Sequence, residues 1–209
     1  MRFAVHYGCY LAIGGAALAL TAVPSVFAEE MVPPAPVQAP AVPTPSTAKA
    51  LPAAQGEVLP TPEEVRFVEL ANQERARRGL GKLTIDPLLI RIARKHSQEM
   101  MEKDYFSHTS PTRGSETPLD RYRVAVPTPP NDYACVGENL YYCTVVDVQR
   151  GHSAFMTSPK HRENVLFPRF EKIGVGIITD QHGKFWVTQM FLTNTPPEVV
   201  AKNRKVSKR

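Results

Sequence analysis

Cysteine and tryptophan are scarce in this chain, and their scarcity limits its chemistry. The 209 residues contain three cysteines, Cys9, Cys135 and Cys143, and a single tryptophan, Trp186. A structural zinc site made of four thiolates needs one cysteine more than this chain has, so such a site is excluded. A nucleophilic serine in a Gly-x-Ser-x-Gly elbow is also missing, which argues against an α/β-hydrolase.

Long apolar runs are missing as well. The most apolar stretch extends from about Tyr10 to Val23, which is under the ~18 residues that a membrane-spanning helix needs. Arg2 precedes this stretch and Val26-Phe27-Ala28 follows it, a pattern typical of a signal peptide with its small-residue cleavage site. We therefore predict that residues 1–28 are a signal peptide and that the protein is exported to the periplasm, cell wall or medium. An uncleaved anchor is the alternative.

The excess of positive charge lies at the ends of the chain. The formal net charge is +5, but bases and acids nearly balance once Arg2 and the five basic residues of the C-terminal tail are set aside. Residues 196–209 are predicted to be a disordered basic tail, which leaves membrane contact to the signal peptide or to this tail. A near-neutral domain gives no support for nucleic-acid binding. Residues 29–60 are rich in Pro and Ala and predict an extended, disordered linker.

Removal of a signal peptide would leave Cys135 and Cys143 in an oxidising compartment. These cysteines flank Gly137-Glu138-Asn139-Leu140, and a bridge between them would close a small loop around Glu138. We expect this disulfide to form. Two free buried thiols are the alternative.

One domain is predicted over residues 61–195. Thr61, Pro62 and Glu64 form a helix start in which threonine caps the helix and proline takes its first position. Asp86-Pro87 repeats that start signal. Helices are predicted over residues 61–79, 86–103, 118–123 and 147–157.

After Phe170 the apolar period changes from helical to alternating, which indicates strands. Residues 173–178 and 185–191 predict two strands joined by a hairpin turn at residues 180–183. Helices followed by an antiparallel hairpin predict an α+β domain.

Three segments bring groups that are useful to chemistry. These are Phe106-Ser107-His108, Gly137-Glu138-Asn139-Leu140, and the run from Ser158 to Leu166 that contains His161. In this order and spacing they resemble the secreted CAP/SCP domain family (cysteine-rich secretory, antigen 5 and pathogenesis-related proteins) in its bacterial form. The resemblance covers roughly Glu63 to Leu192.

The resemblance implies a three-layer α-β-α sandwich with a small antiparallel sheet. It also implies a central cavity lined by two histidines and two glutamates, in which some members bind a divalent cation. His108 and Glu138 match one of each. The second family histidine is replaced by Trp186, and the second glutamate falls near Ser158, so His161 is the candidate for the missing imidazole. Ser158, Trp186 and Gln189 are expected to form the cleft wall, and Asn72 and Arg75 to brace the sandwich.

Three functions fit these residues. The first and favoured one is an exported binding module that holds a cell-wall polymer, a lipid or a secreted protein. The second is a hydrolase in which His108, His161 and Glu138 hold Zn²⁺ or a similar divalent cation with one position open for water, or act without metal as acid and base. The third is a structural protein in which these polar groups only cap helices and tie loops together. Of the other histidines, His96 is predicted to be a packed or surface residue and His182 to face solvent.

Overall fold

The structure of the protein, a computed structural model, describes residues 2–11 and 58–197. Most of the predicted signal peptide and linker, and nearly all of the predicted basic tail, lie outside these residues. The helices are α1 (Pro62–Ala76), α2 (Pro87–Glu102), α3 (Pro118–Ala125), α4 (Val148–Thr157) and α5 (Pro159–Leu166). The strands are β1 (Arg2–Leu11), β2 (Thr84–Ile85), β3 (Tyr133–Cys143), β4 (Lys172–Thr179) and β5 (Phe185–Thr193).

The predicted helix starts are confirmed by their caps. Thr61 accepts a hydrogen bond from the backbone of Glu64 at 3.3 Å, and the Glu64 carboxylate accepts one from the Thr61 backbone at 2.9 Å. Asp86 caps α2 by accepting from the backbone amides of Leu88 and Leu89. Both caps satisfy amides that a helix otherwise leaves unpaired in its first turn.

The strands form one mixed sheet in the order β1-β3-β5-β4-β2. β5 pairs with both β3 and β4 in antiparallel register, and the β4–β5 hairpin turns at Gly183, whose φ of 79° suits glycine. The predicted antiparallel sheet is confirmed for β1, β3, β5 and β4, and the two residues of β2 add a short parallel strand beside β4.

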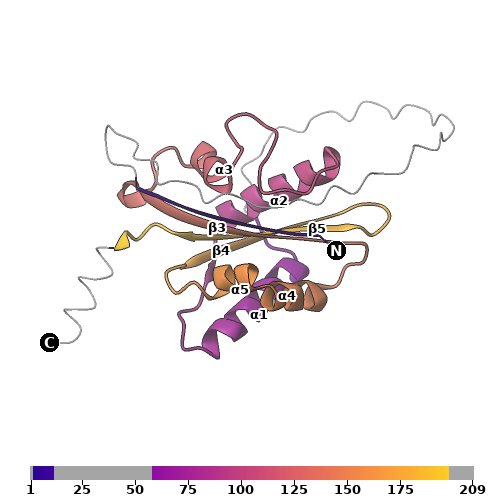
Figure 1. Ribbon diagram of the computed structural model, residues 1–209, viewed down its shortest axis with the longest axis horizontal. Coiled ribbons are helices and arrows are strands. Elements are labelled where there is room, and N and C mark those ends of the chain that lie inside the picture. Colours follow the sequence, from indigo (N-terminus) through magenta and orange to yellow (C-terminus); the bar gives the residue numbers. More distant parts are fainter. Residues whose placement is uncertain (1, 12–57, 198–209) are drawn as a thin grey trace. The chain divides into compact units, whose positions relative to one another are not determined.

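Helices cover both faces of the sheet, which confirms the three-layer sandwich. α2 and α3 pack on one face, and α1, α4 and α5 pack on the other (Figure 1). All nine residues of the central strand β5 are buried, as expected for a strand enclosed on both sides. Within the part of the chain that the structure describes, no helix has the length and hydropathy to cross a membrane.

Two glycines of β4 allow α2 to lie directly on the sheet. A Cβ atom at Gly174 would overlap the backbone of Leu89, and one at Gly176 would overlap the backbone of Arg94. Side chains at these positions would push α2 away from β4. The Gly-x-Gly spacing in a strand therefore fixes the distance between the helix and the sheet.

Arg75 of α1 braces the opposite layer, as predicted. Its side chain is fully buried, and the burial lowers its pKa. Asn72, one turn earlier, exchanges hydrogen bonds with the backbone of Leu83. The Arg75 guanidinium donates to the backbone carbonyls of Gly81 (2.7 Å), Val165 (3.0 Å), Phe167 (2.9 Å) and Phe170 (3.1 Å).

The predicted disulfide between Cys135 and Cys143 is wrong. Both residues lie on β3, eight positions apart in an extended strand. At about 3.3 Å per residue their Cα atoms are roughly 26 Å apart, whereas a disulfide needs less than about 7 Å. Cys143 is a free, half-buried cysteine. The segment around Glu138 is held by the pairing of β3 with β1 and β5.

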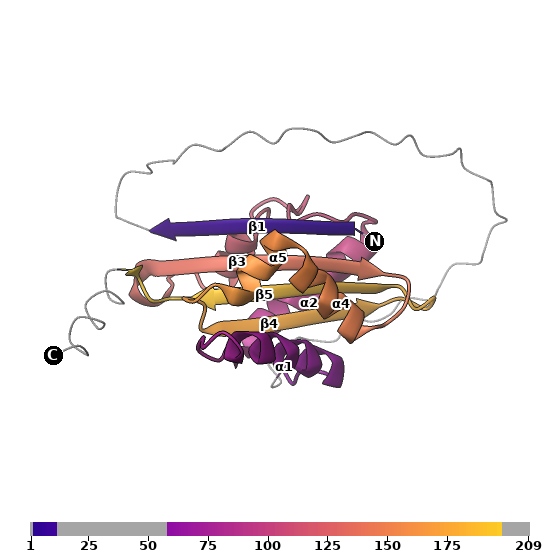
Figure 2. The ribbon, with the colours of Figure 1, turned by 60° about the horizontal axis from the view of Figure 1, so that its bottom comes forward.

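The start of the chain forms an edge strand. β1 pairs antiparallel with β3 along its whole length, with Arg2 opposite Tyr142 and Leu11 opposite Tyr133 (Figure 2). The predicted signal peptide includes this strand, and its cleavage remains a prediction. Cleavage after residue 28 would remove β1 and leave the outer edge of β3 unpaired.

Replacement of Gly176 by alanine tests the close approach of α2. We expect Gly176→Ala to lower the free energy of unfolding by about 2 kcal/mol or more, because the added methyl group overlaps helix backbone that has no room to move. Gly81→Ala is the matched control, since a Cβ there meets nothing within 4 Å, and its effect should stay within about 0.5 kcal/mol. Denaturant unfolding followed by circular dichroism measures both, and equal effects would contradict the packing argument.

Candidate functional site

A buried carboxylate lies at the centre of the site. Glu138 is completely buried on β3 and points toward the layer formed by α2 and α3. Its Oε1 accepts a hydrogen bond from His108 Nδ1 at 2.7 Å, and its Oε2 accepts one from Arg121 Nη2 at 2.6 Å. Both carboxylate oxygens therefore have a charged or polar partner within the protein. The predicted proximity of His108 and Glu138 is correct.

Arg121 connects this carboxylate to the loop that carries His108. It belongs to α3, whose start is fixed by a capping box between Thr117 and Asp120. Its Nη1 donates to three backbone carbonyls of the α2–α3 connection: His108 (3.1 Å), Ser115 (3.3 Å) and Glu116 (3.1 Å). A planar guanidinium with several donors suits this bridging role. Arg121 was not among the predicted site residues, although its place one turn into a well-capped helix was a usable signal.

The surroundings keep Glu138 ionised. Burial by itself raises the pKa of this carboxyl, but Arg121, His96 and His108 outweigh it and hold the pKa at about 2, against an ordinary value of 4.5. Because the folded pKa is depressed, this group stabilises the fold above pH 4.5. That stabilisation is lost as the pH falls from 4.5 toward about 2.

His161 does not join this site. It lies on α5, which packs on the opposite face of the sheet from α2 and α3 (Figure 1). The residue after Glu138 points to that face: the Asn139 amide donates to the His161 carbonyl at 3.1 Å. The His161 ring lies 5.4 Å from the ring of Phe155 of α4. The sheet therefore separates His161 from His108 and Glu138, and the predicted three-residue metal or catalytic cluster does not form.

Other arrangements of metal ligands are also missing from the described structure. Across residues 2–11 and 58–197, no group of three histidine, cysteine, aspartate or glutamate side chains is placed to hold a metal ion. His152 is buried on α4, in the layer opposite Glu138, and burial lowers its pKa. His182 is exposed in the β4–β5 turn, as predicted.

The predicted cleft-wall residues lie apart. Ser158 connects α4 to α5 in the outer layer. On β5, Trp186 packs against Tyr142 with ring centroids 5.0 Å apart. Gln189 is three residues further along the strand and therefore faces the other side, where its Oε1 accepts from Asn139 at 3.1 Å. The three residues do not line a common cleft.

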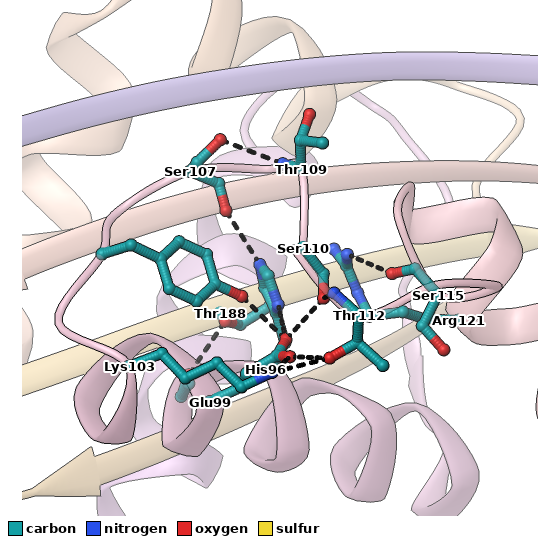
Figure 3. A network of polar contacts seen from close by, with 12 residues as sticks. His96, Glu99, Lys103, Ser107, Thr109, Ser110, Thr112, Ser115, Arg121 and Thr188 are labelled. Atoms are coloured by element: carbon teal, nitrogen blue, oxygen red, sulfur yellow. Dashed lines mark hydrogen bonds and ion pairs between the residues drawn. The ribbon is translucent and has the colours of Figure 1, made fainter.

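A second polar cluster on α2 adjoins the site (Figure 3). His96 is fully buried, with Nε2 placed 3.1 Å from the Ser107 carbonyl and Nδ1 3.8 Å from Glu99 Oε2. Burial lowers the pKa of His96. Sequence analysis treated His96 as a packed or surface residue and did not select Glu99. Their i,i+3 spacing on the buried stripe of α2 was the available signal.

Glu99 collects several donors from the loop that follows α2. Burial raises its pKa, but these donors outweigh burial and lower it. Their convergence folds the loop back over the last turns of α2. The donors are Lys103 Nζ (2.7 Å) and the hydroxyls of Tyr105 (2.7 Å), Ser110 (2.7 Å) and Thr112.

A cavity of about 170 Å³ lies between α2 and α3 beside this cluster. Its apolar lining is Leu88, Ile92, Val124 and Ala125, and its polar lining is Arg91, Lys95, His96, Glu99, Thr112, Ser115 and Arg121. Arg91 and Lys95 are exposed, whereas His96 and Arg121 are buried. The cavity thus joins an apolar wall to a polar inner end and a positively charged rim.

Comparison with known proteins now identifies the fold. The sequence matches CAP, the cysteine-rich secretory protein family, over residues 68–191, more than half of the chain. The chain belongs to the cysteine-rich secretory protein (CAP) family. The family match contains both His108 and Glu138, so the resemblance seen in the sequence is confirmed.

Bacterial proteins are among its relatives. The uncharacterized protein YkwD of Bacillus subtilis is 40% identical over 131 residues, which cover 62% of this chain and 46% of YkwD. The uncharacterized membrane protein YlbC of the same organism is 32% identical over 120 residues, covering 57% and 32%. This CAP chain therefore spans less than half the length of each relative.

Solved CAP structures share the fold. An extracellular SCP-domain protein of Bacillus anthracis is 29% identical with a TM-score of 0.51, and the match covers 63% of this chain and 40% of that one. An outer surface protein of Borrelia burgdorferi is 19% identical with a TM-score of 0.51, covering 63% and 91%. The Borrelia structure supports the fold alone.

The substitution Glu138→Gln tests the buried carboxylate. We expect it to lower the free energy of unfolding at pH 7 by about 3 kcal/mol, because Arg121 loses its buried partner charge. We also expect the variant to lose part of the acid sensitivity of the wild type between pH 4.5 and about 2. Denaturant midpoints at neutral pH, at the ordinary carboxyl pKa of 4.5 and about 1.5 pH units below it measure both effects.

Glu163→Gln is the control for this experiment, since Glu163 is an exposed carboxylate on α5. Its stability should follow the wild type at every pH. Parallel pH profiles for the wild type and Glu138→Gln would show that Glu138 does not carry the acid sensitivity.

Proposed function

We propose that this CAP protein is an exported binding module whose cavity between α2 and α3 holds a small amphiphile with an anionic group. The observation that carries the proposal is the cavity itself, with its apolar wall of Leu88, Ile92, Val124 and Ala125. A concave apolar site with a few convergent polar groups is typical of small-molecule binding. Its volume of about 170 Å³ resembles cavities of about 150 Å³ that hold a benzene-sized ligand.

The charges around the cavity favour a negative ligand group. Glu99 is matched by Lys103 at 2.7 Å, and the buried Arg121 is matched by Glu138 at 2.6 Å. Arg91 and Lys95 are exposed at the rim of the cavity, along α2. A carboxylate or phosphate at the rim would meet these two cations while the apolar part of the ligand packs against the apolar wall.

The arrangement of Glu138 favours binding over hydrolysis. A general base must reach the proton that it abstracts, and the Glu138 carboxylate is fully buried with both oxygens occupied by His108 and Arg121. In this chain Glu138 is a supporting residue. It holds the loop that closes one end of the cavity.

Export and an envelope ligand complete the proposal. The B. anthracis relative is an extracellular protein, and the pattern of residues 1–28 is typical of a signal peptide. An amphiphile with an acidic group is a common constituent of the bacterial envelope, so lipid-derived molecules are the first ligands to test.

Calorimetric titration with octanoate and with uncharged octanol tests this function. We expect saturable octanoate binding, weakened at least about 3-fold in Arg91→Gln and in Lys95→Gln, because each removes one rim cation. Octanol should bind more weakly than octanoate. Ala125→Phe places a ring in the cavity and should abolish binding of both.

Lys160→Gln is the matched control, since Lys160 is an exposed cation on α5, in the other layer. It should bind octanoate like the wild type. An absence of saturable binding, or unchanged binding in a folded Ala125→Phe variant, would refute the proposed function.

A further inference from the structure

A second pocket lies at the end of the sheet where α2 terminates, and aromatic side chains line it. Its volume is about 230 Å³. Its lining comes from the loop after α2, from β3 and from the β4–β5 hairpin: Asp104, Tyr105, Phe106, Tyr142, Lys184 and Trp186. None of the residues that line the α2–α3 cavity belongs to this set.

The aromatic rings are tilted against one another rather than coplanar. The ring of Tyr142 lies 5.0 Å from that of Trp186 and 6.2 Å from that of Phe106, and both pairs have interplanar angles of 55°. Successive tilts of this size produce a concave aromatic surface. Met100 and Leu140 are buried in the same hydrophobic cluster and support the rings.

Two opposite charges complete the lining. Asp104 and Lys184 are both exposed, and they come from different elements, the loop after α2 and the β4–β5 hairpin. Aromatic faces attract cations through their quadrupole, and several faces around one cation form the cages that recognise quaternary ammonium groups. A carboxylate beside such a cage strengthens its preference for a cation.

We propose that this aromatic pocket binds a zwitterionic head group of the phosphocholine type. Its trimethylammonium group lies against Phe106, Tyr142 and Trp186, with Asp104 as the counter-charge. Its phosphate meets the ammonium group of Lys184. This arrangement uses both charges of the pocket.

A zwitterion explains the pocket better than a sugar does. A sugar ring stacks on a flat aromatic face, whereas the rings here are tilted by 55° against one another. A simple cation would leave Lys184 as a repulsive neighbour. A ligand with both charges satisfies the two together.

The position of Trp186 makes the site directly measurable. Trp186 is the only tryptophan of the chain, so its fluorescence reports on this pocket alone. We expect phosphocholine to change the Trp186 emission in a saturable manner and to bind more tightly than choline. 3,3-Dimethylbutyl phosphate, in which carbon replaces the ammonium nitrogen and the phosphate is kept, is the matched probe without the positive charge and should bind at least about 3-fold more weakly.

Substitutions test the roles of the two charged residues and of the aromatic rings. Asp104→Asn and Phe106→Leu should each weaken phosphocholine binding about 3- to 10-fold. Lys184→Gln should weaken phosphocholine binding and strengthen choline binding, because Lys184 attracts the phosphate and repels a simple cation. Phe167→Leu removes an aromatic ring from the α5 side of the sheet and should have no effect.

Two results would overturn the proposal. One is an equal response to phosphocholine and to 3,3-dimethylbutyl phosphate, which would show that the pocket does not recognise the positive charge. The other is no saturable response to phosphocholine in folded protein, with folding checked by circular dichroism. Because Asp104 and Lys184 are exposed, their variants should fold and keep the test valid even if Phe106→Leu does not.

Vesicles distinguish the source of the head group. Co-sedimentation with phosphatidylcholine vesicles, but not with phosphatidylglycerol vesicles, would assign it to a lipid. Binding of soluble phosphocholine without co-sedimentation would assign it to a free or polymer-linked head group. Neither result depends on octanoate binding in the α2–α3 cavity, so this proposal and the proposed function can fail separately.

Discussion

The buried ion pair between Glu138 and Arg121 determines how the α2–α3 side of this CAP domain is built. An isolated carboxylate in the protein interior would be costly, so its presence requires a partner charge. Arg121 supplies that charge through Nη2 and uses its Nη1 group to hold the carbonyls of the loop after α2. The loop in turn positions His108 and the hydroxyl groups that surround Glu99. One buried charge thus orders both the α2–α3 connection and the wall of the cavity.

Strand alternation divides the Gly-Glu-Asn-Leu motif between two layers. Glu138 faces α2 and α3, whereas Asn139 faces α5 and shares hydrogen bonds with His161 and Asn164. The amide of Asn164 also donates to the Glu138 carbonyl at 3.0 Å. Adjacent residues in the motif therefore make their contacts on opposite faces of the sheet. His161 belongs to the structural network of the outer layer, which Arg75 extends through the carbonyls of Val165 and Phe167 at the end of α5.

The sequence predicted elements whose ends carry their own chemical signal. Thr61, Asp86 and Gly183 mark two helix starts and a hairpin turn, and all three were confirmed. β3 was missed because its Gly137-Glu138-Asn139 core contains residues that are common in turns, and only tertiary packing makes it a central strand. Only part of the site was predicted, because its geometry also depends on tertiary packing. His108 and Glu138 follow from the family pattern, but the separation of His161 depends on which face each strand residue takes, and that required the position of β3.

The buried polar groups on the two faces of the sheet therefore make different contacts. On the α1, α4 and α5 side, buried polar groups such as Arg75 and Asn139 donate hydrogen bonds to backbone carbonyls and to neighbouring side-chain amides. These bonds favour a rigid layer. On the α2 side, the polar groups lie next to open volume. Tyr105 marks the boundary between the two pockets there: its hydroxyl donates to Glu99 at 2.7 Å, while the residue lines the aromatic pocket. Burial and the Glu99 carboxylate raise the pKa of Tyr105, so this hydroxyl stays protonated and keeps donating. A loop held in this way by one carboxylate can present two chemically different surfaces on a single rigid support.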